Sequence, residues 1–191
     1  MLFRSISDNY QEESIKFDIS KIKLITIDIE VASENGFPDV ESSQEEILTI
    51  SIQDYFTKKI ITWGVNQFDN QNPNVKYIRC NSEYDLLDRF MFYWENNCPD
   101  VVTGWNCDFY DIPYVYRRIS RVIGEKVAKQ LSPWGIVTEN EVTSNGRTHS
   151  RYDIAGVSIL DYLDLYKKFT YTTQESYKLD HIALDRKSTR L

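Results

Sequence analysis

The sequence predicts an α/β fold in which helices flank a mixed sheet and a β-hairpin protrudes from the body. Three segments rich in β-branched residues follow one another between residues 21 and 65. Two segments with helical spacing of apolar residues follow at 82–97 and 111–124, with the short apolar segment 101–104 between them. An Asn-Gly pair then lies between two extended flanks in 135–159. Strands followed by a helix, a strand and a second helix favour a mixed sheet with helices packed against it.

The first strand is predicted for residues 21–31 and is largely buried. Its apolar residues are Ile22, Leu24, Ile25, Ile27, Ile29 and Val31. After a loop that contains Pro38, residues 47–53 and 59–65 predict the second and third strands. The connection 55–58 is short enough for a hairpin, so the three strands are expected to be antiparallel neighbours.

A short strand at 75–79 precedes the first helix, at whose start Ser82 and Asp85 form a capping box. The apolar residues of this helix recur at helical spacing: Leu86, Leu87, Phe90, Met91 and Trp94. The strand 101–104 leads to the second helix, which Gly124 stops. In this order of elements, the strand 101–104 is expected to lie parallel to the first strand.

The segment 135–159 has the pattern of a two-stranded ribbon. Asn145-Gly146 at its centre is the strongest short-range signal for a tight hairpin turn. The flanks are too polar for a hairpin in the core, so the ribbon is expected to protrude. Residues 159–166 return to the body as the end of a strand and a short helix.

The composition describes a folded chain without a membrane-spanning segment. Of the 191 residues, 41% are hydrophobic and 14% aromatic, which argues against general disorder, and the length suits one domain. No segment approaches the ~20 consecutive apolar residues of a membrane-spanning helix, so we expect a soluble intracellular protein without a membrane partner. The cysteines Cys80, Cys98 and Cys107 match neither a disulfide framework nor a zinc site.

The formal net charge of −7 argues against nucleic-acid binding through bulk electrostatics alone. It does not exclude a nucleic-acid-binding protein whose carboxylates hold metal ions. Basic residues gather in one helical stretch: Arg117, Arg118, Arg121, Lys126 and Lys129. We interpret them as a solvated helix face in preference to a surface that follows phosphates, and the sequence leaves both interpretations open.

Asp28 and Glu30 are two residues apart at the end of the first strand, so both side chains point to the same face of the sheet. Ile27 and Ile29 alternate with them and can enter the core, which would hold the acids rigidly. Two neighbouring carboxylates repel each other, and hard divalent cations relieve this repulsion. An Asp-x-Glu triplet alone is weak support for a metal site, because most such triplets are solvated.

Asp111 follows the strand 101–104 and opens the next helix. If this strand lies near the first strand, Asp111 faces the same edge as Asp28 and Glu30, and three carboxylates converge. Asp111 has a second interpretation as an N-cap that accepts backbone N–H groups, and the two roles are compatible.

The residues around these acids resemble the first and second exonuclease motifs of family B DNA polymerases. The motifs are Asp28-Ile29-Glu30 with Phe37-Pro38 shortly after, and Asn106 to Tyr110-Asp111. Further segments are similar to the replicative polymerases that T-even-type bacteriophages have in this family: Gly104-Trp105-Asn106, Leu131-Ser132-Pro133, Leu160-Asp161-Tyr162, Asp164–Phe169 and Ser176–Asp180. The resemblance covers about Ser7 to Ala183 and implies a ribonuclease-H-like exonuclease domain.

The resemblance implies that Asp28, Glu30 and Asp111 are catalytic and ligate two Mg²⁺ or Mn²⁺ ions, which activate a water and stabilise the leaving 3′ oxygen. The reaction would remove one deoxynucleoside monophosphate from a 3′ end during proofreading. Phe37 would stack on a terminal base, or else fold back on the core. Asn106 would lie near the bound strand, or else tie down its turn.

The resemblance also implies that the ribbon helps to separate primer from template. Arg147 at its tip would contact a phosphate or simply keep an exposed turn soluble.

The same resemblance predicts how the chain is divided. Residues 1–20 are expected to be the remnant of a preceding segment, and residues 21–184 the exonuclease domain without its third motif. The fourth metal-binding Asp would then lie beyond Leu191, followed by palm, fingers and thumb. Residues 185–191 match the translation of a widely used sequencing adapter, so we expect a non-native tail from adapter read-through.

The expected partners are a DNA primer-template with a single-stranded 3′ end and, for the full-length polymerase, a sliding clamp and other replisome proteins. The expected location is the cytoplasm of an infected bacterial host. Two alternatives remain open: a stand-alone exonuclease of the same four-acid group, and a non-catalytic DNA-binding module of this fold. Continuation of the intact gene into polymerase motifs excludes the first alternative, and a divalent-metal titration separates the second from an enzyme.

Overall fold

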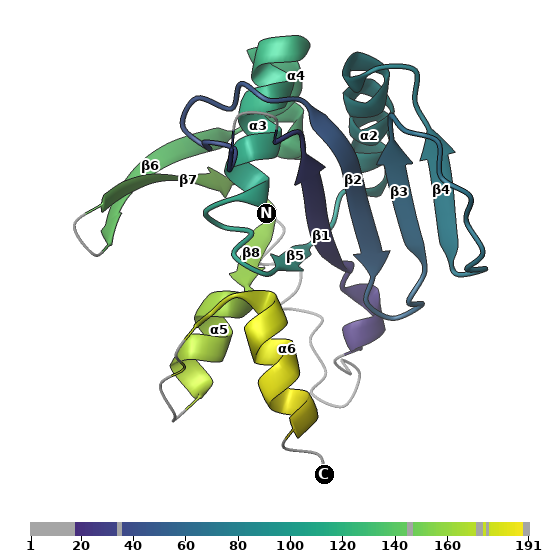
Figure 1. Cartoon of the computed structure of the whole chain (residues 1–191). Helices are drawn as coiled ribbons and strands as arrows, with labels where there is room; N and C mark the ends of the chain where they lie inside the picture. Colours follow the sequence, from purple (N-terminus) through teal and green to yellow (C-terminus); the bar gives the residue numbers. More distant parts are fainter. Residues whose placement is uncertain (1–17, 34–35, 145–146, 171–173, 175, 189–191) are drawn as a thin grey trace, which may run out of the picture.

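The computed structural model describes residues 18–33, 36–144, 147–170, 174 and 176–188. Its main element is a six-stranded mixed sheet with the strand order β4-β3-β2-β1-β5-β8, and β6 and β7 form a separate two-stranded sheet. The helices α2 and α3 pack on the sheet, whereas α5 and α6 lie at one end of the molecule, next to β8 (Figure 1). The predicted α/β architecture, a mixed sheet flanked by helices, is confirmed.

The strands agree with the predicted segments to within a few residues. Their bounds are β1 (Leu24–Val31), β2 (Ile47–Asp54), β3 (Ile60–Gly64), β4 (Val75–Arg79), β5 (Val101–Gly104), β6 (Val137–Ser144), β7 (Arg147–Ile154) and β8 (Ser158–Asp161). As predicted, β1, β2 and β3 are antiparallel neighbours and β5 is parallel to β1. The ladder between β1 and β5 covers only Leu24 to Thr26, so the end of β1 that carries Asp28 and Glu30 extends past β5.

The helices and helical turns are η1 (Ile19–Lys21), α2 (Glu83–Asn97), α3 (Asp111–Val122), α4 (Glu125–Ala128), η2 (Lys129–Leu131), α5 (Tyr162–Phe169) and α6 (Leu179–Ser188). Ser82 caps α2 as predicted, because its hydroxyl accepts a hydrogen bond from the Asp85 N–H (3.3 Å). Gly124, whose φ of +135° suits glycine, follows the end of α3. Within the described part of the chain, no helix has the length and apolarity that crossing a bilayer requires.

The apolar faces of α2 and α3 form one core with the sheet. Fully buried members of this core are Ile27, Ile50, Trp63, Leu86, Leu87, Phe90, Trp94, Tyr114 and Ile119. Burial of each such side chain contributes about 1.5–3 kcal/mol, so this face of the sheet is a rigid support for whatever β1 carries on its other face.

The ribbon of β6 and β7 pairs from Val137 opposite Ile154 to Ser144 opposite Arg147. The predicted Asn-Gly turn lies outside the described residues. The expectation that the whole ribbon is too polar for the core is wrong at its base, where Tyr152 and Ile154 are buried. The remainder of the ribbon extends away from the body (Figure 1).

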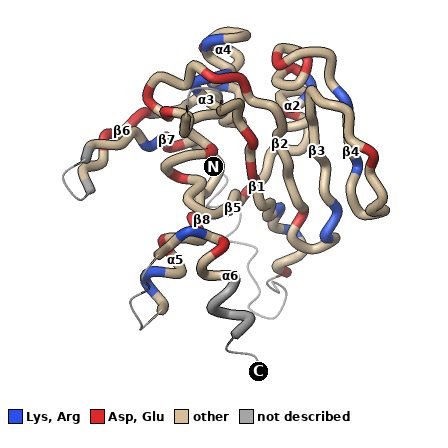
Figure 2. Tube along the Cα trace, in the orientation of Figure 1, with Lys and Arg blue, Asp and Glu red and all other residues tan. Residues whose placement is uncertain are grey.

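The predicted basic stretch is solvated only in part. Arg121 and Lys126 are exposed, whereas Arg118 is buried and Arg117 half-buried, and both bind the protein itself. Arg118 is 5% exposed and donates to Glu83 Oε1 (2.8 Å) and to the Ser43 carbonyl (3.1 Å). Arg121 also donates to the Ser43 carbonyl, and Arg117 forms ion pairs with Glu side chains of the β1–β2 loop and of β6. These arginines therefore tie the loop between β1 and β2 to α3. Figure 2 shows that Lys and Arg residues are interspersed with Asp and Glu along the described part of the chain.

The last helix, α6, extends into the segment 185–191, for which we expect a non-native origin. That expectation concerns the source of the sequence and stays a prediction.

Candidate active site

The acids of β1 alternate with residues of the core. Ile27 and Ile29 are 2% and 6% exposed, whereas Asp28 and Glu30 are exposed on the opposite face. The antiparallel ladder with β2 continues along this part of β1, where Asp28 lies opposite Ser51. A paired strand therefore holds both carboxylates, in agreement with the prediction that they share one face of the sheet.

Asp111 is the first residue of α3, and its carboxylate reaches β1. Its Oδ1 accepts a hydrogen bond from the Ile29 N–H (3.1 Å), and Asp111 is only 4% exposed. This N–H lies past the end of the ladder with β5, so the Asp111 carboxylate is the acceptor where the β5 backbone has ended. Tyr110 holds the N-cap position of α3 and makes no side-chain cap, so the interpretation of Asp111 as the N-cap is wrong.

The three carboxylates interact electrostatically in series. Desolvation, followed by the charge of Asp28, raises the pKa of Asp111 to about 7. Desolvation, followed by the charge of Glu30, also raises the pKa of Asp28. Among the described residues, no Lys, Arg or His forms an ion pair with any of the three acids. Asp28 is thus close enough to Asp111 and to Glu30 for their charges to interact, and no ion pair with a described basic residue offsets these charges.

The described residues do not include a cluster of side chains that could hold a metal ion. In the described ranges of the chain, no three His, Cys, Asp or Glu side chains converge closely enough to enclose one metal ion. The prediction that Asp28, Glu30 and Asp111 converge as three carboxylates is therefore not confirmed, since within these ranges the acids do not form such a group.

Phe37 is exposed and lies near Tyr110, the residue that precedes Asp111. It is 85% exposed, and its ring lies 5.5 Å from the ring of Tyr110, centroid to centroid. With Pro38 and Gln44 it lines a groove of about 250 Å³. The pKa of the Tyr110 hydroxyl is raised to about 12, chiefly by desolvation. Phe37 therefore offers a free ring face and is not folded into the core.

Asn106 and Arg147 are placed less completely. Asn106 has a φ of +62°, in the left-handed region, and its backbone N–H donates to Asp161 Oδ1 (3.0 Å). The backbone of Asn106 therefore ties down its turn, and contact of its side chain with DNA stays a prediction. The backbone of Arg147 pairs with Ser144 at the outer end of the ribbon, and the contact of Arg147 with a phosphate stays a prediction.

Two buried acids near the site were missed from the sequence. Asp161 is 6% exposed and accepts hydrogen bonds from the N–H groups of Asn106, Asp108 and Leu163. Asp108 is 4% exposed, and its Oδ2 lies 3.0 Å from Arg151 Nε. Desolvation raises the pKa of Asp108 to about 6. An Asp directly before the apolar run of α5 is a detectable cap signal for Asp161, whereas no pattern in the sequence indicates the burial of Asp108.

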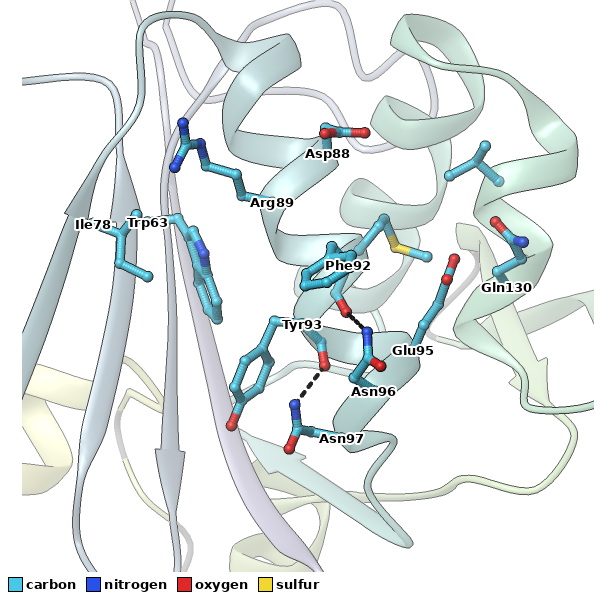
Figure 3. Close-up of a pocket in the computed structure, with 12 residues that line it drawn as sticks. Trp63, Ile78, Asp88, Arg89, Phe92, Tyr93, Glu95, Asn96, Asn97 and Gln130 are labelled. Carbon is cyan, nitrogen blue, oxygen red and sulfur yellow. Dashed lines mark hydrogen bonds between the residues drawn. The ribbon is translucent and has the colours of Figure 1, made fainter.

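A cavity of about 510 Å³ beside α2 is separate from the acids (Figure 3). Its walls include Trp63 of β3, Phe92 and Tyr93 of α2 and Gln130 of η2. No residue of β1 or of the turn 106–111 lines it, so this cavity is not part of the candidate site.

Comparisons with known proteins agree with the resemblance to a known family. The sequence model described as "DNA polymerase family B, exonuclease domain" matches residues 4–182. The chain is 34% identical to the DNA-directed DNA polymerase of Escherichia phage RB69 and 32% identical to that of Enterobacteria phage T4. Each alignment covers 93% of this chain and 22% of the relative.

More distant relatives include the DNA polymerase catalytic subunit of Human herpesvirus 6B (strain Z29), which is 27% identical over 83% of this chain and 16% of the relative. The chain thus spans about a fifth of the length of the phage polymerases it matches. Because the family model matches nearly the whole chain, and because its acids lie where β1 meets α3, the chain belongs to the family B DNA polymerases, in the region of their exonuclease domain.

Proposed function

We propose that the chain is the proofreading 3′-to-5′ exonuclease domain of a phage replicative DNA polymerase, with Asp28, Glu30 and Asp111 as its catalytic acids. The observation that carries the proposal is the hydrogen bond from the Ile29 N–H to Asp111, which fixes a buried carboxylate beside the acids of β1. Two relatives that align over 93% of the chain are DNA-directed DNA polymerases, which supports DNA as the substrate.

The donor set of this site fits a hard divalent cation such as Mg²⁺ or Mn²⁺. All three residues offer carboxylate oxygens, which these cations prefer. The raised pKa values of Asp28 and Asp111 reflect desolvation and mutual repulsion, which a bound cation would offset. The resemblance implies two ions, held by Asp28, Glu30 and Asp111. When bound, such ions supply charge stabilisation and promote ionisation of water for phosphodiester hydrolysis.

The residues of the chain would orient the 3′ end for in-line attack. The terminal nucleotide would approach the exposed face of β1, where Phe37 presents its ring for stacking on the last base. Such stacking is tolerant of sequence and contributes ~1–3 kcal/mol per base, as proofreading of any nucleotide requires. Asn106 would contact the bound strand near its end.

The remaining parts of the proposal concern organisation. The sheet is proposed to be ribonuclease-H-like, and the ribbon β6–β7 to act as a protruding hairpin that helps to part primer from template, with Arg147 near a phosphate. Residues 1–20 would be the remnant of a preceding segment, 21–184 the exonuclease domain, and 185–191 a non-native tail. The full-length polymerase would work with a sliding clamp and other replisome proteins in the cytoplasm of an infected bacterium.

The experiment compares residues 1–184 alone with the same segment extended by the downstream part of the parent gene. Each protein is incubated with a 5′-labelled single-stranded oligonucleotide and Mg²⁺ or Mn²⁺, and the products are resolved on a gel. We expect the extended protein to shorten the oligonucleotide stepwise from its 3′ end. The short piece should do so poorly, because small misplacements of reacting groups cost catalysis heavily.

Absence of metal-dependent shortening by the extended protein would contradict the proposed function. Full activity of the short piece would show that an acid already present, Asp164 or Asp180, completes the site.

A further inference from the structure

A single buried carboxylate joins the end of β8 to the turn that carries Asn106. Asp161 Oδ1 accepts hydrogen bonds from the N–H groups of Asn106 (3.0 Å) and Leu163 (2.8 Å), and its Oδ2 accepts one from the Asp108 N–H (3.0 Å). We propose that Asp161 is a positioning residue, which holds the turn 106–111 so that Asp111 stays beside Asp28. This inference rests on the proposed role of Asp28 and Asp111 as metal-binding acids.

Helix capping alone does not account for this arrangement. A cap needs one bond to an N–H of the first turn, as Ser82 provides for α2. Asp161 makes that bond to Leu163 and two more, to residues that are 55 and 53 positions earlier in the chain. Within the described residues it has no basic partner, so three amide dipoles stabilise its charge. A neutral capping residue could not accept all three.

The turn transmits this anchor to Asp111. The Asn106 carbonyl accepts hydrogen bonds from the N–H groups of Phe109 (3.2 Å) and Tyr110 (3.0 Å), and the Cys107 carbonyl accepts one from the Ile112 N–H (3.0 Å). Asn106 itself is held in the left-handed region, which costs energy for a residue other than glycine. The segment from 106 to the start of α3 is therefore one hydrogen-bonded unit, with Asp161 at one end and the bond from Ile29 to Asp111 at the other.

Asp161 is not itself proposed as a metal ligand. Both of its oxygens are used by backbone N–H groups, and Asp161 is 6% exposed. Asp28, in contrast, is exposed. Supporting residues of this kind typically change metal affinity or activity by roughly 10- to 100-fold when they are mutated.

The test uses the 191-residue chain with two substitutions of Asp161 and one control. Asp161→Asn keeps the size of the side chain but presents an NH₂ group to one of the N–H donors. Asp161→Ser retains an oxygen that can cap Leu163 but is too short to hold the turn. Ser82→Ala removes the cap of α2, which typically costs ~1 kcal/mol and leaves the turn untouched.

Two quantities are measured on each protein. Amide hydrogen exchange of Asn106 and Asp108, read by NMR without metal, reports on the turn itself. We expect it to accelerate about tenfold in both Asp161 variants and to stay unchanged in Ser82→Ala. Mn²⁺ affinity, measured by electron paramagnetic resonance, should fall roughly tenfold in both Asp161 variants and change less than about twofold in the control.

Folded Asp161 variants that bind Mn²⁺ as tightly as the unmodified chain would overturn the positioning role. Asp28→Ala and Asp111→Ala are measured in parallel, because they address the proposed function. If these two also bind Mn²⁺ normally, the metal is not at the acids and both proposals fail. If they lose Mn²⁺ while the Asp161 variants keep it, only the role of Asp161 fails.

Discussion

Replacing Asp111 by Asn is expected to stabilise the metal-free protein, and more so as the pH rises. The pKa of Asp111 is about 7 in the folded chain against an ordinary value of 3.8, because the carboxyl is buried and faces Asp28. Below the ordinary value Asp111 is protonated in both states. Between the two values only the unfolded chain has released the proton. The stability that protonated Asp111 contributes therefore decreases as the pH rises, and this contribution is lost above the folded pKa.

The difference between the folded and unfolded pKa values of Asp111 corresponds to about 4 kcal/mol of stability, at 1.36 kcal/mol per pKa unit. This value is an upper bound on the effect. Asn is neutral throughout and can still accept the hydrogen bond from the Ile29 N–H. The advantage of Asp111→Asn over the unmodified chain should therefore grow by about 2–3 kcal/mol between about pH 5 and pH 8.

The assay is urea unfolding in the presence of a chelator, followed through the fluorescence of buried Trp63 and Trp94. Asp88→Asn, an exposed change on α2, serves as the control and should stay within about 0.5 kcal/mol at both pH values. Adding Mn²⁺ at the higher pH should stabilise the unmodified chain and not Asp111→Asn. An advantage of Asp111→Asn that is constant or shrinks with rising pH would refute the reasoning.

Three further changes test other parts of the structure. Arg118→Met should cost about 3–5 kcal/mol in urea unfolding, because it leaves Glu83 buried without its partner, and a loss below about 1 kcal/mol would contradict the buried ion pair. Phe37→Ala should weaken binding of single-stranded DNA by about 5- to 150-fold, measured by fluorescence anisotropy. The melting temperature of the protein should not fall, because the ring is exposed. Unchanged affinity for the DNA would exclude stacking. Gly104→Ala should cost about 1–3 kcal/mol in thermal unfolding, because the added Cβ would lie 2.8 Å from Cys107 Cβ and 2.8 Å from the Ile27 carbonyl oxygen. A neutral effect would contradict this and show that the turn rearranges at little cost.

The sheet was predictable from the sequence because each strand carries its own local signal. β1 to β3 are rich in β-branched residues, and their short connections leave little choice of neighbour. The parallel pairing of β5 with β1 followed from the order of strand, helix and strand. The buried base of the ribbon was missed because Tyr152 and Ile154 stand among polar residues. Their burial depends on distant parts of the chain, such as Tyr116 of α3, whose ring lies 4.5 Å from that of Tyr152, centroid to centroid.

The site was predictable in part for the same reason. Asp28 and Glu30 alternate with apolar residues, so their common face can be read from the period of the strand. The inward orientation of Arg118 depends on partners that lie 35 to 75 residues away. Two of the three hydrogen bonds to Asp161 come from residues 53 and 55 positions away, and only the bond from Leu163 is local. Such contacts leave no local pattern, and clustered charges look solvated until the loop that they bind is in place.

The central claim is that the acids of β1 serve hydrolysis at the 3′ end and not folding. The most direct measurement is made on the full-length polymerase that is proposed to contain this segment, with Asp28 and Glu30 both changed to Ala. Shortening of a 5′-labelled primer without nucleotides and its extension with nucleotides are measured side by side in Mg²⁺. We predict that 3′-to-5′ shortening is abolished while extension continues at its normal rate, because nucleotide addition would use separate acids. Equal loss of both activities, or shortening that persists, would contradict the assignment of Asp28 and Glu30 to the exonuclease site.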